Sequence, residues 1–317
     1  MTYSSGGLIQ ATDYNGFVST TVGANVNATW STGTTSAGYG QTAISTVSAA
    51  GTVTATQWAT LVNTITSMAA HNGTTITSRV APTTGSTIAI LAALNTDITN
   101  CYNNRGNAVA SGSQFTGWTG TNSKTGTTSG ATWTITFTNT VTFASADAAR
   151  YFFNAGGLVK IDVSKTAVGA FGDPEWNDLA NTLCGDIWIS GGAFNQTIAG
   201  TVYTGTTKVG GTGTPNILTT GTGWFDLTTS PTIVYKQFAD TAPYTNNFIQ
   251  HSLSATATAL TITTLWSASD GDPISGGTAA SGATPGTAPC TIVTYFPPST
   301  TNLSASWGTP TISASVA

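Results

Sequence analysis

The stretch Thr132-Trp-Thr-Ile-Thr-Phe-Thr138 alternates polar threonines with large apolar side chains at every second position. Successive side chains of a β-strand point to opposite faces of a sheet. This spacing therefore places Trp133, Ile135 and Phe137 together on one face. The stretch predicts a strand that is buried on one side and threonine-rich on the other.

Segments of the same kind recur from Ser111 onward, separated by turn residues at the intervals typical of a β-sandwich. The expected strands are residues 187–189, 200–203, 223–227, 232–235, 247–249, 259–263 and 291–295. Residues 151–154 and 158–163 flank Gly156-Gly157, which predicts a β-hairpin. Residues 303–316 are expected to form a strand pair or an arm.

One short helix is expected inside this β-rich region, with Asp173 as its N-cap and Pro174 at its first position. Its inner face would carry Trp176, Leu179 and Leu183. Residues 270–289, rich in Gly, Ala, Ser and Pro, are expected to form a loop of low complexity.

The first 110 residues carry nearly all of the helical signal. Helices at about residues 54–70 and 86–102 would each align an apolar stripe at i, i+3, i+4, i+7 spacing. The stripes comprise Trp58, Leu61, Val62, Ile65, Met68 and Ala69, and then Ile90, Leu91, Leu94, Ile98 and Tyr102. A shorter helix capped by Thr12 would run through Tyr14 and Phe17. Since Thr and Asn are mediocre helix formers, these stripes should be buried against each other or a neighbouring subunit.

These patterns predict an α+β protein with two parts. Residues 1–110 would form a small helical module for attachment or oligomerisation. Residues 111–317 would form a mainly antiparallel, β-sandwich-like body, and a subdivision near residue 200 stays open. A trimer and a hexamer are both consistent with such a chain, because oligomers of this kind are symmetric.

Charged residues make up only 6% of the 317-residue chain, against roughly 25% in an ordinary soluble domain. The surface must therefore be built from Thr, Ser, Asn and Gly, whose interactions depend little on ionic strength. The formal net charge is −4, and the eight Lys and Arg residues are spread along the chain. Without a basic cluster, nucleic-acid binding is not expected. No apolar run approaches the ~20 residues that span a bilayer, so no membrane insertion is expected.

The sequence lacks the usual signatures of catalysis, so we expect neither an enzyme nor a cofactor. His71 and His251 have no second His or Cys at ligand spacing, and His71 should sit partly charged at a helix C-terminus. The three cysteines, Cys101, Cys184 and Cys290, are expected to be small buried side chains, although one bridge between two of them stays open. Asp270-Gly-Asp272 is expected in a solvated loop rather than in a metal site.

Two regions resemble virion structural proteins of tailed bacteriophages from marine and freshwater bacteria. Tyr39-Gly-Gln41, then Thr54-Ala-Thr-Gln57-Trp58 and a helix ending near His71, is similar to a strand-to-helix module of those proteins, over about residues 8–105. Residues 151–157, Tyr-Phe-Phe-Asn-Ala-Gly-Gly, and the helix at 176–179 resemble their β portion, over about residues 130–200.

This resemblance implies a component of the tail, baseplate, neck or fibre that binds other virion proteins and copies of itself. The first ten residues have neither a basic nor an apolar region, so we expect no export signal there, and we expect assembly in the host cytoplasm followed by release through lysis. The expected assembly and fold anchors are Tyr39, Gln41, Gln57, Trp58, Leu61, Ile65, Leu91, Leu94, Ile98, Tyr151, Phe152, Phe153 and Trp176.

Three alternatives stay open. A receptor- or glycan-binding adhesin would contact a host surface glycan through exposed aromatics, for which Trp118, Trp188, Trp224, Trp266 and Trp307 are candidates. A glycan hydrolase would need two acidic side chains in a groove, such as Asp270 with Asp272 or Glu175 with Asp178. A head decoration protein would differ only in its place in the particle.

Overall fold

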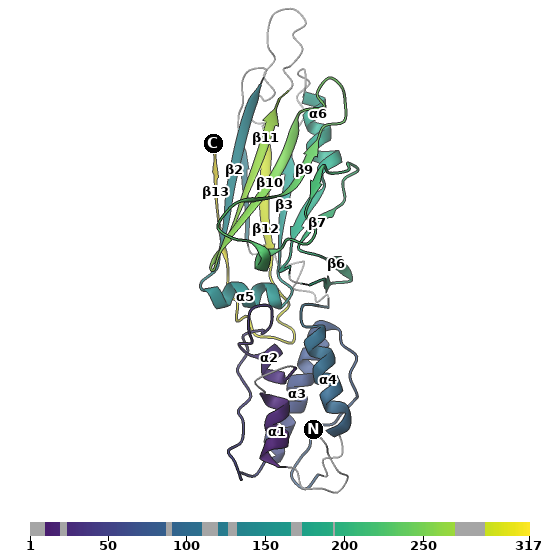
Figure 1. The fold of residues 1–317 in the computed structure, drawn as a ribbon, viewed down its shortest axis with the longest axis vertical. Helices are drawn as coiled ribbons and strands as arrows, with labels where there is room; N and C mark the ends of the chain where they lie inside the picture. The colour runs from purple at the N-terminus through teal and green to yellow at the C-terminus, as the bar shows by residue number, and fades with distance from the viewer. Residues whose placement is uncertain are drawn as a thin grey trace, which may run out of the picture.

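The computed structural model describes residues 10–19, 24–86, 91–109, 120–125, 132–165, 173–192, 194–269 and 289–317. The molecule is elongated, with helices at one end and a β-sandwich at the other (Figure 1). Its fold is α+β, with the helices first in the chain and mainly antiparallel sheets after them. The predicted fold class is confirmed.

The helical end consists of α1 (Ala11–Val18), α2 (Val26–Trp30), α3 (Ala55–Asn72) and α4 (Leu91–Asn103). The two long helices confirm the predicted pair, and α3 ends at Gly73, whose φ of 72° is the left-handed conformation that glycine adopts easily. The predicted cap of α1 is wrong. Gln10 begins this helix, because the Asp13 carboxylate accepts the Gln10 backbone N–H (3.0 Å).

The sandwich consists of two facing antiparallel sheets. One has the order β1 (Gly120–Thr125), β12 (Cys290–Phe296), β3 (Leu158–Ser164), β4 (Asp186–Ile189) and β7 (Thr206–Val209). The other has the order β13 (Thr311–Val316), β2 (Trp133–Thr142), β11 (Ala259–Ala268), β10 (Phe248–Thr256), β9 (Thr232–Phe238) and β8 (Ile217–Leu218). A separate hairpin joins β5 (Gln196–Ile198) to β6 (Thr201–Tyr203).

The core confirms the alternation that predicted the first strand. Trp133, Ile135 and Phe137 of β2 are buried, and Phe137 meets Trp266 of β11 edge-to-face, with 6.4 Å between ring centroids. The buried apolar cluster is continuous from Ala11 in α1 to Trp307, which lies between β12 and β13. The helices and the sandwich therefore share one hydrophobic core.

The predicted hairpin at Gly156-Gly157 is wrong, because the segment before it is helix α5 (Ala146–Asn154). The Ser145 side chain caps this helix by accepting the Ala148 N–H (3.0 Å). The two glycines end the helix, and the Gly157 N–H donates to Phe152 O (2.8 Å). The aromatic run favours a strand by propensity, but the cap and the buried helical face decide the structure.

Two further strand predictions are corrected. Residues 223–227 contain a 3₁₀ turn, η2 (Trp224–Asp226), because the Asp226 carboxylate accepts the Gly223 N–H (3.0 Å) and closes the turn. Residues 31–54, expected to begin a strand-to-helix unit, contain no strand. The expected segment at 303–316 contains one strand, β13.

The predicted short helix is confirmed as α6 (Asp173–Asp178), which continues as a π-helical turn, η1 (Leu179–Cys184). The side chains of Trp176, Leu179 and Leu183 are buried, as expected. Trp176 lies between Trp133 and Trp266, with centroid distances of 4.7 Å and 5.7 Å. This stack closes the sandwich core at the end away from the helices.

Candidate functional site: the junction between helices and sandwich

Helix α5 lies across the base of the sandwich, next to the helical end (Figure 1). Its Arg150 Nη1 donates to Thr32 O (2.8 Å) and Ala37 O (3.0 Å), and its Asn154 Nδ2 donates to Gly38 O (3.1 Å). These carbonyls belong to the irregular chain that follows α2. Because this segment is not part of a β-sheet, its carbonyls need other hydrogen-bond partners. The α5 side chains provide them and hold the segment against the sandwich.

Tyr39 is the centre of this contact. Its side chain is fully buried, its Oη donates to Arg105 O (2.7 Å), and its ring meets the His71 ring edge-to-face at 5.1 Å. Gly40 follows with a φ of 69°, and a Cβ at this position would lie 2.3 Å from the Tyr151 ring. Tyr39 therefore anchors its ring in the core, and Gly40 next to it lets the backbone approach α5 closely.

The same segment is tied to the end of the chain. Ser306 Oγ donates to Tyr39 O (2.5 Å), and Gln41 Nε2 donates to the same carbonyl (3.0 Å). The Gln41 side chain also reaches Ser304. The structure thus brings Tyr39, Gln41 and Tyr151 together, although they come from regions that the sequence separates.

His71 is buried at the C-terminal end of α3, with Nε2 3.0 Å from Ala155 O. Burial lowers the pKa of His71 to about 4, although the Ala155 carbonyl acts in the opposite direction. The expectation of a partly charged imidazole is therefore wrong, because desolvation outweighs the helix dipole. A carbonyl can only accept, so Nε2 carries the proton of the neutral ring.

The three cysteines are free: Cys101 and Cys184 are buried, as expected, and Cys290 is half-buried. Burial raises the pKa of Cys101 to about 12, and the nearby Asp97 acts in the same direction. Burial likewise raises the pKa of Cys184 to about 12. A protonated thiol is a poor nucleophile, so neither buried cysteine suits covalent chemistry in this arrangement.

Gln196 was not predicted and is one of the most connected side chains of the junction. It is buried, its Nε2 donates to Gly106 O (2.9 Å) and Phe153 O (3.1 Å), and its Oε1 accepts the Gly191 N–H (2.9 Å). One amide therefore joins α5, the segment after α4 and the β4–β5 loop. Nothing in the surrounding Asn-Gln-Thr sequence distinguishes it from a surface glutamine.

Most of the other predicted anchors belong to the shared hydrophobic core. Trp58, Leu61, Ile65, Leu94 and Ile98 are buried in the helical end. Leu91 is the first residue of α4. Gln57 has a local role, since its Oε1 accepts the Thr54 N–H (2.8 Å) and completes a capping box. Phe152 and Phe153 are buried on α5 at the base of the sandwich.

The candidate glycan-binding tryptophans that the structure describes pack against neighbouring rings or lie in the core. Trp266 and Trp307 are buried, Trp188 lies 4.7 Å from the Phe296 ring, and Trp224 stacks on Phe153 at 5.3 Å. Trp118 lies outside the described residues. Their packing favours the core role over an exposed aromatic platform.

The acidic candidates show no metal geometry in the part of the chain that is described. No group of three His, Cys, Asp or Glu side chains there could hold a metal ion. Glu175 and Asp178 lie on α6, whereas Asp270 and Asp272 lie outside the described residues. Among the described helices, none has the length and apolar character that crossing a membrane requires.

Comparisons with protein-family models, curated proteins and solved structures gave no match to this chain.

Proposed function

We propose that the protein is a structural component of a tailed-phage virion, in the tail, baseplate, neck or fibre, and that it acts through protein–protein assembly. The observation that carries the proposal is the junction, where buried side chains of α5 and the β4–β5 region bind the backbone of the helical end. A virion protein that is attached at one end and projects at the other must hold its two ends in a fixed relative position.

The contacts of the junction support a stiff connection. Tyr39 and Gln196 are buried, and the hydrogen bonds they make run between segments far apart in the chain. Flexible interdomain connections normally have few buried contacts and small, polar interfaces. Here the apolar core continues through the junction. The two ends are therefore expected to move together rather than as two hinged domains.

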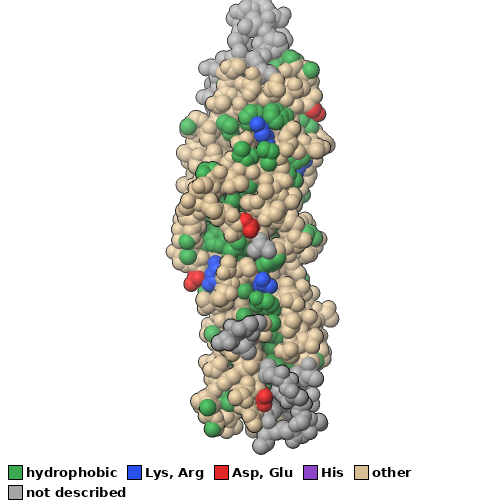
Figure 2. All heavy atoms as spheres, in the orientation of Figure 1, with side chains coloured by type: hydrophobic (Ala, Val, Ile, Leu, Met, Phe, Trp, Pro, Cys, Tyr) green, Lys and Arg blue, Asp and Glu red, His purple; other side chains and the backbone are tan. Residues whose placement is uncertain are grey.

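The surface also supports assembly with other copies or other virion proteins. The face in Figure 2 is mostly uncharged, with few Lys, Arg, Asp and Glu side chains. Packing such a surface against a neighbour removes few charges from water, and desolvation of charges is a large cost of association. The resemblance of the Tyr39-Gly-Gln41 and 151–157 segments to tailed-phage virion proteins points to the same role.

The proposal is tested with virions encoded by the genome that carries this chain. Purified particles are analysed by mass spectrometry and by immunogold labelling with an antibody against the sandwich. We expect the chain in stoichiometric amounts, with gold at the tail, baseplate, neck or fibres. Gold on the capsid would instead favour the decoration-protein alternative. Absence of the chain from purified particles would overturn the structural role.

A further inference from the structure

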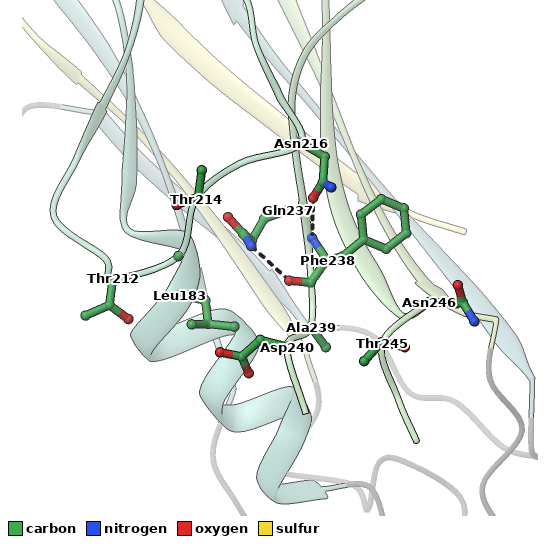
Figure 3. A pocket seen from close by; sticks show the side chains of 11 residues that line it. Leu183, Thr212, Thr214, Asn216, Gln237, Phe238, Ala239, Asp240, Thr245 and Asn246 are labelled. Atoms are coloured by element: carbon green, nitrogen blue, oxygen red, sulfur yellow. Dashed lines mark hydrogen bonds between the residues drawn. The ribbon is translucent and has the colours of Figure 1, made fainter. Parts of the chain in front are cut away.

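A cavity of about 670 Å³ lies beside the end of β9 (Figure 3). The sheet register places it away from the helices: Phe238 pairs with Phe248 at one end of β10, whereas the opposite end of the sheet leads through Thr142 into α5. Its size is in the range of small-molecule sites, about 300–1,000 Å³. The junction described above does not use it.

One wall of the cavity is formed by Thr212, Gly213, Thr214 and Asn216, in a segment that other parts of the fold hold in place. Lys208 Nζ donates to the carbonyls of Gly210 (3.0 Å), Gly211 (3.0 Å) and Gly213 (2.9 Å). The Gly213 N–H donates to Leu183 O (3.1 Å) at the end of η1. A single cation thus gathers three carbonyls and shapes the loop before any ligand arrives.

The opposite wall is the connection from β9 to β10. The Ala239 N–H donates to Asn247 O (2.9 Å), and the Tyr244 side chain is buried beneath the loop. Asn216 joins the two walls, because its Oδ1 accepts the Phe238 N–H (3.3 Å). A site that is already formed loses less conformational entropy when it binds a ligand.

The floor of the cavity contains an unpaired acceptor. Gln237 is only 5% exposed, and its Nε2 donates to Phe238 O (2.9 Å). Its Oε1 is buried and has no hydrogen-bond partner. Figure 3 shows this side chain extending from β9 toward Leu183 and Thr214. A buried acceptor without a partner is costly, so a donor from a bound molecule would be favourable here.

The chemistry of the lining selects one class of ligand. Hydroxyls and amides surround the opening, and Leu183 and Ala239 contribute apolar surface. Asp240 is the one acidic residue in the described part of the lining. Among the described residues, no Lys or Arg lines the cavity, so this lining does not suit an anion. One carboxylate is also too few for a typical Ca²⁺ site, which collects 6–8 oxygen ligands.

We propose that this cavity binds a neutral saccharide. Sugar hydroxyls both donate and accept, so they can pair with the threonine hydroxyls, the side-chain amides and the free Gln237 oxygen. The C–H face of a sugar ring can pack on Leu183 and Ala239. This inference goes beyond the assembly role and does not require the chain to be part of a virion. In an assembled particle, the end away from the helices would carry the site.

The test uses the full chain, labelled with ¹⁵N and followed by NMR as glucose, galactose, mannose and N-acetylglucosamine are added to tens of millimolar. We expect shift changes in residues 212–216, 237–240 and 245–246 with at least one of these sugars. Glucuronic acid should bind more weakly than glucose, because Asp240 repels its carboxylate. Shift changes elsewhere in the protein, or none with any sugar, would overturn the proposal.

Two tryptophan variants, one at the cavity and one at the other end of β9, complete the test together with a Gln237 variant. Thr214→Trp fills the cavity from its exposed rim and should weaken binding at least tenfold. Thr232→Trp places the same ring at the opposite, exposed end of β9 and should leave binding unchanged. Gln237→Leu should also weaken binding while the thermal unfolding midpoint is retained. Equal affinity of the Thr214→Trp and Thr232→Trp variants would contradict the assignment.

Discussion

Gln41 and Ser304, 263 positions apart in the chain, exchange two hydrogen bonds. The Ser304 N–H donates to Gln41 Oε1 (2.8 Å), and Gln41 Nε2 donates to Ser304 O (2.9 Å). The side-chain amide thus pairs with the backbone as a neighbouring strand would. This pairing fixes the segment before the last strand to the chain that follows α2. Both segments contribute to the junction on which the assembly proposal depends.

Gln41→Ala should lower the free energy of unfolding by about 1–2 kcal/mol, because several backbone groups lose a partner. Gln41→Glu should cost more at pH 7, since a carboxylate would face the carbonyls of Tyr39 and Ser304. Urea denaturation followed by circular dichroism measures both variants. If Gln41→Ala were as stable as the unmodified protein, this contact would have no energetic role at the junction.

Arg79 and Asp97 form a buried ion pair within the helical end, with side chains that are 2% and 6% exposed. Arg79→Ala should destabilise the protein by about 3–5 kcal/mol, because it leaves a buried carboxylate without its counter-charge. The double variant Arg79→Met/Asp97→Leu should recover most of this loss. Thermal or urea unfolding of the three proteins measures the coupling.

A surface ion pair provides the control for that experiment. Asp147 is 59% exposed beside Arg150, and its removal should cost less than about 1 kcal/mol. Equal losses for Arg79→Ala and Asp147→Ala would show that burial of the first pair has no energetic weight.

The sequence predicted the elements whose pattern is local. Strict alternation identified β2, and the apolar stripes together with the Asn72-Gly73 end identified α3. It failed where a cap or a turn overrides propensity. An aromatic run that favours a strand became α5 because Ser145 caps it, and residues 223–227 closed into a 3₁₀ turn around Asp226.

The site was predicted only in part, for a physical reason. Tyr39, Gln41 and Tyr151 were identified, but the groups that Tyr39 and Gln41 contact come from α3, the segment after α4 and the last segment of the chain. Contacts such as those of Gln196 depend on tertiary placement, and a polar residue in a polar segment gives no periodic signal. Most of the lining of the Gln237 cavity comes from loops, where hydrophobic periodicity carries no information.

Asn139 lies on the buried face of β2, and neither its Oδ1 nor its Nδ2 has a hydrogen-bond partner. Asn139→Leu should stabilise the protein by about 1–2 kcal/mol, because it replaces an unsatisfied amide with an apolar side chain of similar size. The adjacent Thr138→Val, on the other face, should change stability by less than about 0.5 kcal/mol. A destabilised Asn139→Leu variant would indicate that this amide is satisfied in solution.

Acid should weaken the fold through two buried histidines. Burial lowers the pKa of His71 to about 4 and that of His251 to about 3, from an ordinary value of 6.5. The unfolded chain binds protons around pH 6.5 that the folded protein excludes. Stability is therefore complete well above pH 6.5 and falls on acidification, down to about pH 4 for His71 and about pH 3 for His251. Each residue should cost about 2 kcal/mol at pH 5.

Urea midpoints at pH 7.5 and pH 5 measure this loss, and His71→Gln provides the control. A glutamine amide can still donate to Ala155 O but does not titrate in this range. The variant should therefore lose about half as much stability between the two pH values. An unchanged pH dependence in His71→Gln would exclude this residue as a source of the acid sensitivity.

A cryo-EM map of the intact particle, with this chain traced in it, would test the assembly role. The assembly proposal predicts density at the tail, baseplate, neck or fibre, with the helical end against partner subunits and the sandwich projecting as one rigid body with it. A particle map without this chain, or one in which the helical end projects freely while the sandwich is attached, would contradict the account.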